Sequence, residues 1–144
     1  MSHLLDTCVL SECVKKQPNP FVSQWMNQQP PAQLFLSNIT IAELRKGIYK
    51  IELSQPERHK KLQDWLQTIE LKFHLRILPV NDRVLSTWAK ISADAELQGK
   101  KLAVMDSLIA ATALEFNLVL VTRNSSDFEH TGVPLFNPWQ LAGE

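Results

Sequence analysis

Hydrophobic residues recur along this chain with two spacings, one typical of short buried strands and one typical of amphipathic helices. Short apolar runs bounded by polar or turn residues predict five strands, within residues 3–6, 33–37, 76–80, 118–121 and 133–136. Apolar residues at intervals of three and four predict helices over residues 41–51, 62–73, 84–95 and 109–114. Pro18 and Pro20 separate two further short helices between the first two strands, the second carrying Phe21, Val22 and Trp25.

Strands that alternate with helices predict parallel pairing through helical crossovers. We therefore expect an α/β fold, a three-layer sandwich in which helices flank a short, mostly parallel central sheet. No internal repeat, low-complexity tract or linker divides the sequence, so residues 1–144 are expected to form a single domain.

Composition and charge narrow the classes of partner and compartment. The 15 Lys and Arg residues balance the 15 Asp and Glu residues, so attraction to nucleic acid would have to come from a local basic patch. Cys8 and Cys13 lack a metal-site spacing, which favours two free thiols in a reducing compartment. No apolar run reaches the roughly 18–20 residues of a membrane span, and Asp6 interrupts the N-terminal apolar stretch that a secretory signal needs. We expect a cytoplasmic domain that does not bind a membrane.

Four acidic residues from distant parts of the chain are predicted to meet at one edge of the sheet. Asp6 ends the first strand, and Glu43 lies in the first turn of the helix after the second strand. Asp106 opens the helix before the clearest strand, and Asp127 lies in the loop after that strand. Ligands of open parallel sheets bind beyond the carboxyl ends of the strands, and hard oxygen donors without His or Cys select Mg²⁺, or Mn²⁺ in its place. The pattern predicts a metal-dependent phosphoryl-transfer site.

Most of these acids also have an ordinary structural interpretation. Thr40 and Glu43 have the spacing of a helix capping box. Asp106 is a first-turn acid of the kind that the helix dipole favours, and Asp127 fits an ordinary turn. Asp6 is the exception, since a strand-end aspartate between apolar residues has no evident role in a helix.

Four blocks of sequence, residues 4–12, 39–47, 106–113 and 121–124, are recognisable together with the ending Phe136-Asn137-Pro138-Trp139. In this order the blocks resemble those of the PIN-domain nucleases, and in particular the VapC/FitB-type toxins of bacterial toxin–antitoxin modules, and the ending is similar to that branch as well. The resemblance implies a Mg²⁺-dependent ribonuclease that cleaves single-stranded or loop RNA. It also implies a homodimer and a cognate antitoxin whose segment fills the acidic groove.

Carried over by motif, Asp6 and Asp106 match the principal metal ligands of the family, and Glu43 matches the second acidic position. The fourth position departs from the family pattern, because Asn124 stands where many members have an aspartate. Either Asp127 supplies the missing carboxylate or the site holds a single metal ion.

Polar and basic neighbours of these acids complete the predicted site. Thr7 and Thr122 are expected to hydrogen-bond the carboxylates and so fix their orientation, with Asn124 in support. Arg45, Lys46 and Arg123 are expected to form a basic lip that binds RNA.

Two features of the sequence bear on other functions. Three of the four tryptophans lie at apolar helical positions, which favours core or dimer packing over base stacking. Asn124 favours the alternative of a non-catalytic or weakly active PIN-like module that only binds nucleic acid.

Overall fold

The computed structural model, which describes residues 1–140, contains one sheet whose neighbouring strands all run parallel. Its strand order is β3-β2-β1-β4-β5, and the strands are β1 (His3–Leu5), β2 (Leu34–Ser37), β3 (Ile77–Leu78), β4 (Val119–Val121) and β5 (Leu135–Phe136). The central strand β1 pairs Leu5 with Val121 of β4. The predicted α/β fold is confirmed, and each strand lies inside the range that the sequence indicated.

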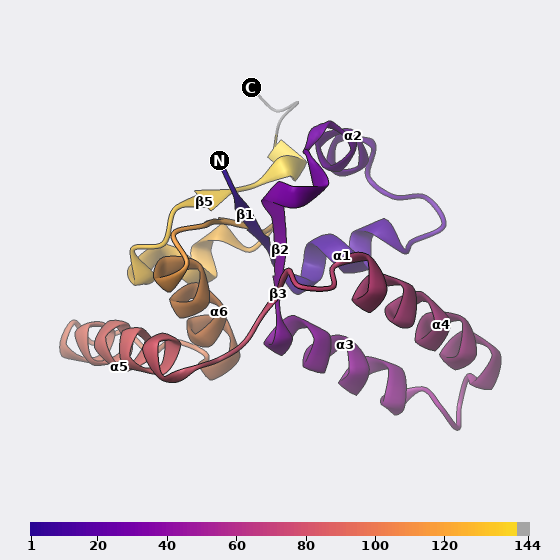
Figure 1. Cartoon of the computed structure of the whole chain (residues 1–144). Helices are drawn as coiled ribbons and strands as arrows, with labels where there is room; N and C mark the ends of the chain where they lie inside the picture. The colour runs from indigo at the N-terminus through magenta and orange to yellow at the C-terminus, as the bar shows by residue number, and fades with distance from the viewer. Residues whose placement is uncertain (141–144) are drawn as a thin grey trace.

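The helices cover both faces of this sheet. They are α1 (Thr7–Cys13), α2 (Pro20–Gln28), α3 (Asn38–Lys50), α4 (Pro56–Lys72), α5 (Asp82–Leu97) and α6 (Val104–Glu115), with short 3₁₀ turns η1 (Pro31–Gln33), η2 (Ser125–Thr131) and η3 (Pro138–Gln140). In Figure 1, α5 and α6 lie on one side of the strands, and α1, α3 and α4 lie on the other. Among residues 1–140, no helix combines the length and the apolar character that a membrane crossing needs.

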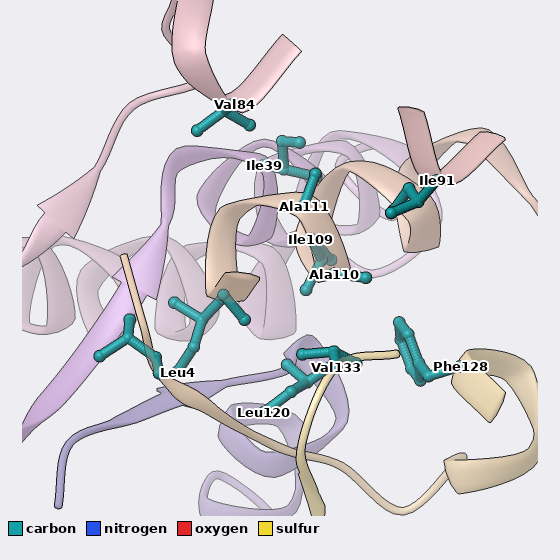
Figure 2. Packing of buried hydrophobic residues seen from close by; sticks show 12 residues of the cluster. Leu4, Ile39, Val84, Ile91, Ile109, Ala110, Ala111, Leu120, Phe128 and Val133 are labelled. Atoms are coloured by element: carbon teal, nitrogen blue, oxygen red, sulfur yellow. The ribbon is translucent and has the colours of Figure 1, made fainter. Parts of the chain in front are cut away.

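Alternation along the strands divides the hydrophobic interior into two cores. Successive side chains of a strand point to opposite faces, so Leu4 and Leu120 pack with Ile109 of α6 in the first core. Figure 2 shows this core between α6 and the strands. Leu5 and Val121 face the second core, which α1, α2, α3 and α4 cover. Two cores on either side of one sheet produce the three-layer sandwich.

Two strands lead directly into helices, and the residue that precedes each helix caps it. The Asp6 side chain accepts a hydrogen bond from Thr7 N at the start of α1, and the Ser37 side chain accepts one from Ile39 N at the start of α3. Two expectations are therefore corrected. Asp6 does have a helical role, as an N-cap, and the capping box of Thr40 and Glu43 is wrong because α3 begins before Thr40.

Candidate active site

Asp6 lies at the carboxyl end of the central strand, where hydrogen bonds fix both of its carboxylate oxygens. Its Oδ1 accepts from Thr7 N at 2.8 Å, and its Oδ2 accepts from Thr122 Oγ1 at 2.7 Å. Thr122 follows the neighbouring strand β4, and the residues Thr122 and Asp6 are 0% and 5% exposed. Pairing of the two strands thus brings residues 116 positions apart into contact at one edge of the sheet.

Thr7 connects Asp6 to the second predicted acid. Its hydroxyl donates to Glu43 Oε1 at 2.6 Å, while its backbone N–H is the one that binds Asp6. The Thr40 hydroxyl lies 3.4 Å from the Thr7 hydroxyl. Thr7 therefore orients two carboxylates, that of Asp6 just before α1 and that of Glu43 on α3.

Asp106 is half-buried at the start of α6, where negative charges surround it. Burial raises its pKa to about 6, with further contributions from the charges of Asp6, Asp127 and Glu43. Burial also raises the pKa of Asp6, against the hydrogen bonds from Thr122 and Thr7, and the Glu43 charge raises it further. The other three acids all act on Asp106 through their charges, and the four residues are called the acidic cluster below.

Asn124 and Asp127 are the two candidates for the fourth acidic position. The Asp127 carboxylate acts on Asp106 through its charge, although Asp127 is exposed on η2. Within residues 1–140, the hydrogen bonds that Asn124 makes run through its backbone, from its N–H to Thr122 Oγ1 and from Asp127 N to its carbonyl. Of the two residues, Asp127 is the one that adds negative charge to the cluster.

Cys8 contacts the same carboxylate and was not predicted as part of the site. Its Sγ lies 3.8 Å from Asp6 Oδ2 and 3.6 Å from Thr122 Oγ1, and it accepts a hydrogen bond from Arg123 N at 3.4 Å. Burial, and then the Asp6 charge, raise the pKa of this thiol, so it remains a neutral donor to Asp6. The only signal in the sequence was its place within the first block, two residues after Asp6.

The basic residues expected to form one lip are not brought together. Arg45 forms an ion pair with Glu70 of α4, whereas Glu43 lines a groove on a different face of α3. Lys46 is exposed on α3. Arg123 is exposed directly after Thr122, next to the acidic cluster. Of the three, only Arg123 is adjacent in sequence to Thr122, whose hydroxyl binds Asp6.

The donor chemistry of the acidic cluster fits a hard divalent cation. Carboxylates without a nearby His are the ligands that Mg²⁺ and Mn²⁺ prefer. A cation would offset the charges of Asp6, Asp127 and Glu43, which add to burial in raising the pKa of Asp106. Among the described residues, no three acidic, His or Cys side chains already enclose a site for a metal ion.

A parallel sheet with an acidic cluster at its carboxyl edge is the arrangement that the sequence blocks led us to expect. Comparison with known proteins identifies the family. The PIN domain family model matches residues 3–134. The chain belongs to the PIN-domain family, as the four sequence blocks predicted.

Individual relatives place the chain within that family. Toxin FitB of Neisseria gonorrhoeae is 38% identical over 138 residues, which cover 94% of this chain and 97% of FitB. The VapC ribonuclease Y4jK of Sinorhizobium fredii is 35% identical over 140 residues, which cover 96% of this chain and 99% of the relative. The crystal structure of FitAcB from Neisseria gonorrhoeae contains a chain with 39% identity and a TM-score of 0.89, with 96% of this chain and 99% of that chain covered. The chain is thus a PIN-domain protein of the VapC/FitB group.

Proposed function

We propose that this chain is a metal-dependent endoribonuclease, acting as the toxin of a toxin–antitoxin module. The observation that carries the proposal is the acidic cluster, in which two hydrogen bonds fix Asp6, and burial together with three acidic neighbours raises the pKa of Asp106. The names of two relatives, a VapC ribonuclease and a toxin, support RNA cleavage and toxicity.

In this proposal Asp6 and Asp106 hold Mg²⁺, and Glu43 and Asp127 complete the ring of negative charge. A bound Mg²⁺ supplies a more acidic water and positive charge against the scissile phosphate. Thr122 and Thr7 keep Asp6 in one orientation, and Thr7 also holds Glu43 in reach of the same site. Orientation by such outer partners is worth 10- to 100-fold in metal affinity or activity at many metal sites.

A groove beside the acidic cluster gives the proposed antitoxin a place to bind. The groove has a volume of about 570 Å³ and runs from Thr7 and Glu43 between α1, α3 and α4. Its apolar lining includes Leu44, Ile48, Leu62 and Trp65, and its basic lining consists of Lys15, Lys16 and Arg58. An apolar segment with acidic residues matches this surface. Bound there, it would also cover Glu43 and so inhibit the site. A toxin of this kind needs such an inhibitor if its host is to grow.

The test is cleavage of a labelled single-stranded RNA by the purified chain, with Mg²⁺ or with EDTA. We expect cleavage only with Mg²⁺, and a loss of more than about 100-fold in Asp106→Asn and Asp6→Asn, since even outer partners of a metal site matter by 10- to 100-fold. Asp94→Asn on α5, outside the cluster, is the matched control and should cleave normally.

Two outcomes would contradict the proposal in different ways. Cleavage that persists in EDTA and in Asp106→Asn would exclude the carboxylate-held metal. Binding of RNA without cleavage under any condition would favour the alternative, a PIN-like module that binds nucleic acid without catalysis.

A further inference from the structure

Arg123 lies beside the acidic cluster without pairing with it. Its backbone follows Thr122, the Asp6 partner, and its N–H donates to Cys8 Sγ at 3.4 Å. A guanidinium in such a place is strongly attracted to carboxylates and binds them in bidentate geometry. Nevertheless, the ion pairs formed within residues 1–140 involve other cations and not Arg123. Something else holds the guanidinium.

The partner of the Arg123 guanidinium is the indole of Trp139. Arg123 Cζ lies 5.5 Å from the centroid of the Trp139 ring, which is cation–π geometry. Asn137 secures the same contact from the backbone side. Its Nδ2 donates to the Arg123 carbonyl at 3.4 Å, and its Oδ1 accepts from Trp139 N at 2.9 Å. The segment of residues 137–139 thus contacts both the backbone and the side chain of Arg123.

The residues that contact Arg123 are themselves packed into the folded core. Pro138 is buried, and Trp139 packs against the second core. Phe136, at the end of β5, stacks on Trp25 of α2 with ring centroids 5.3 Å apart. The η3 turn lies next to α2 (Figure 1). Trp139 is therefore held by the sheet and by α2, independently of Arg123.

We propose that Asn137 and Trp139 hold the Arg123 guanidinium away from the acidic cluster, where it binds an RNA phosphate next to the scissile one. A guanidinium paired with Asp6 or Asp106 would neutralise the carboxylates that the metal needs. It would then be unable to bind an RNA phosphate. Trp139 is accordingly a positioning residue that acts through Arg123. This inference rests on the proposed function, because the ligand is the RNA that the acidic cluster would cleave.

The test is a double-mutant cycle on RNA binding, in an Asp106→Asn background that prevents cleavage during the titration. Binding of a fluorescent single-stranded RNA is measured for Arg123→Ala, Trp139→Leu and the pair. Leucine keeps apolar bulk but lacks the ring face and the indole N–H, which hydrogen-bonds the Glu12 carboxylate. Trp139→Phe keeps a ring face but lacks the same N–H, so it controls for the loss of the Glu12 contact. We expect Arg123→Ala and Trp139→Leu each to weaken binding about 5-fold, Trp139→Phe to retain most of it, and the pair to be no weaker than Arg123→Ala alone.

Salt dependence and a spectroscopic signal distinguish a Trp139 that positions Arg123 from a Trp139 with another role. Loss of one phosphate contact should lower the slope of log affinity against log salt by about 0.7 for a single strand, in both Arg123→Ala and Trp139→Leu. Lys90→Ala, a remote exposed cation on α5, should leave the slope unchanged. The Nε–H resonance of Arg123 should be shifted by the indole ring current in the wild type and should lose that shift in Trp139→Leu.

Additive losses in the cycle would overturn the inference, because Trp139 would then bind RNA itself, for example by stacking on a base. An Arg123 resonance that Trp139→Leu does not move would overturn it as well. Failure of the proposed function gives a different result: the wild type would not cleave RNA with Mg²⁺, whatever the cycle shows.

Discussion

At the scale of single residues, Asp106 gives the site a measurable pH dependence. Its pKa is raised to about 6 in the folded protein without metal, from an ordinary value of 3.8. The folded state therefore binds a proton more tightly than the unfolded state does, and the free energy of unfolding falls as pH rises from about 4 to about 6. The raised pKa of Asp6 acts in the same direction.

Asp106→Asn should remove most of the loss of stability that ionisation of Asp106 causes above pH 4. We expect the variant to be more stable than the wild type by about 1 kcal/mol at pH 7.5, after allowance for solvent screening of a half-exposed group, and equally stable near pH 4. Urea denaturation in EDTA at the two pH values measures the difference. Asp94→Asn should show no such gain, and equal stability of Asp106→Asn and the wild type at pH 7.5 would contradict the electrostatic account.

Thr122 is the residue whose hydroxyl connects the two central strands at the site. It is fully buried, donates to Asp6 Oδ2 and accepts from Asn124 N. Thr122→Val keeps the shape but leaves both partners without this bond, so we expect Mg²⁺ affinity to fall about 10- to 100-fold and the free energy of unfolding to fall by about 1–3 kcal/mol. Calorimetric titration with Mg²⁺ measures the first effect. Thr122→Ser, which retains the hydroxyl, should restore most of the affinity, and unchanged affinity in Thr122→Val would exclude the orienting role.

The types of residue at the site were predictable, whereas several of their contacts were not. Asp6 could be found because it directly follows a strand, and Asp106 because it lies in the first turn of a helix. Glu43 was expected in a first turn as well but lies beyond it in α3. The contact of Trp139 with Arg123, and those of Cys8 with Thr122 and Arg123, could not be predicted, because they depend on how separate segments pack in the fold. Arg45 was misjudged as part of a lip for the same reason, since Glu70 lies on another helix.

At the scale of elements, hydrophobic period predicted where helices and strands lie, but not which residue begins them. Ser37 and Thr40 are both suitable N-caps near the start of α3. Burial of Ser37 at the end of β2 decides between them, because its hydroxyl is then the one that meets the free Ile39 N–H. The 3₁₀ turn η2 was likewise unexpected in a Ser-Ser-Asp loop, although it is the element that carries Asp127.

The cap of α3 supports the site as well as the helix. Ser37→Ala should lower the free energy of unfolding by about 1–2 kcal/mol, the upper part of the range for such caps, because Ser37 is fully buried. Since α3 carries Glu43, fraying of its first turn should also weaken the Thr7–Glu43 hydrogen bond and reduce cleavage. Urea denaturation and RNA cleavage assays measure the two effects. Ser86→Ala, at an exposed position on α5, is the control, and a Ser37→Ala variant as stable as that control would exclude the cap.

At the scale of the whole molecule, the formal net charge is +0, and several acids and bases are paired, such as Lys15 with Glu12 and Arg45 with Glu70. The acidic cluster occupies the carboxyl edge of the sheet, and basic residues lie around it on separate elements: Lys15 and Lys16 after α1, Arg58 on α4, and Arg123 after β4. Attraction of RNA therefore depends on local contacts, which salt screens within about 10 Å at 0.1 M. The same arrangement offers an acidic inhibitor segment the basic groove without any change in net charge.

Metal binding should stabilise the entire fold, because the acidic cluster exists only when β1, β4, α3 and α6 are assembled. A ligand that binds only the folded state at 100 times its dissociation constant adds about 2.7 kcal/mol, which for a domain of this size raises Tm by about 8 °C. We expect Mg²⁺ and Mn²⁺ to produce such a shift in the wild type, and Asp106→Asn to lose it although its metal-free Tm is higher at pH 7.5. NaCl at matched ionic strength is the control. If NaCl raised Tm as much as Mg²⁺, or Asp106→Asn responded as fully as the wild type, the acids would be repelling one another without forming a metal site.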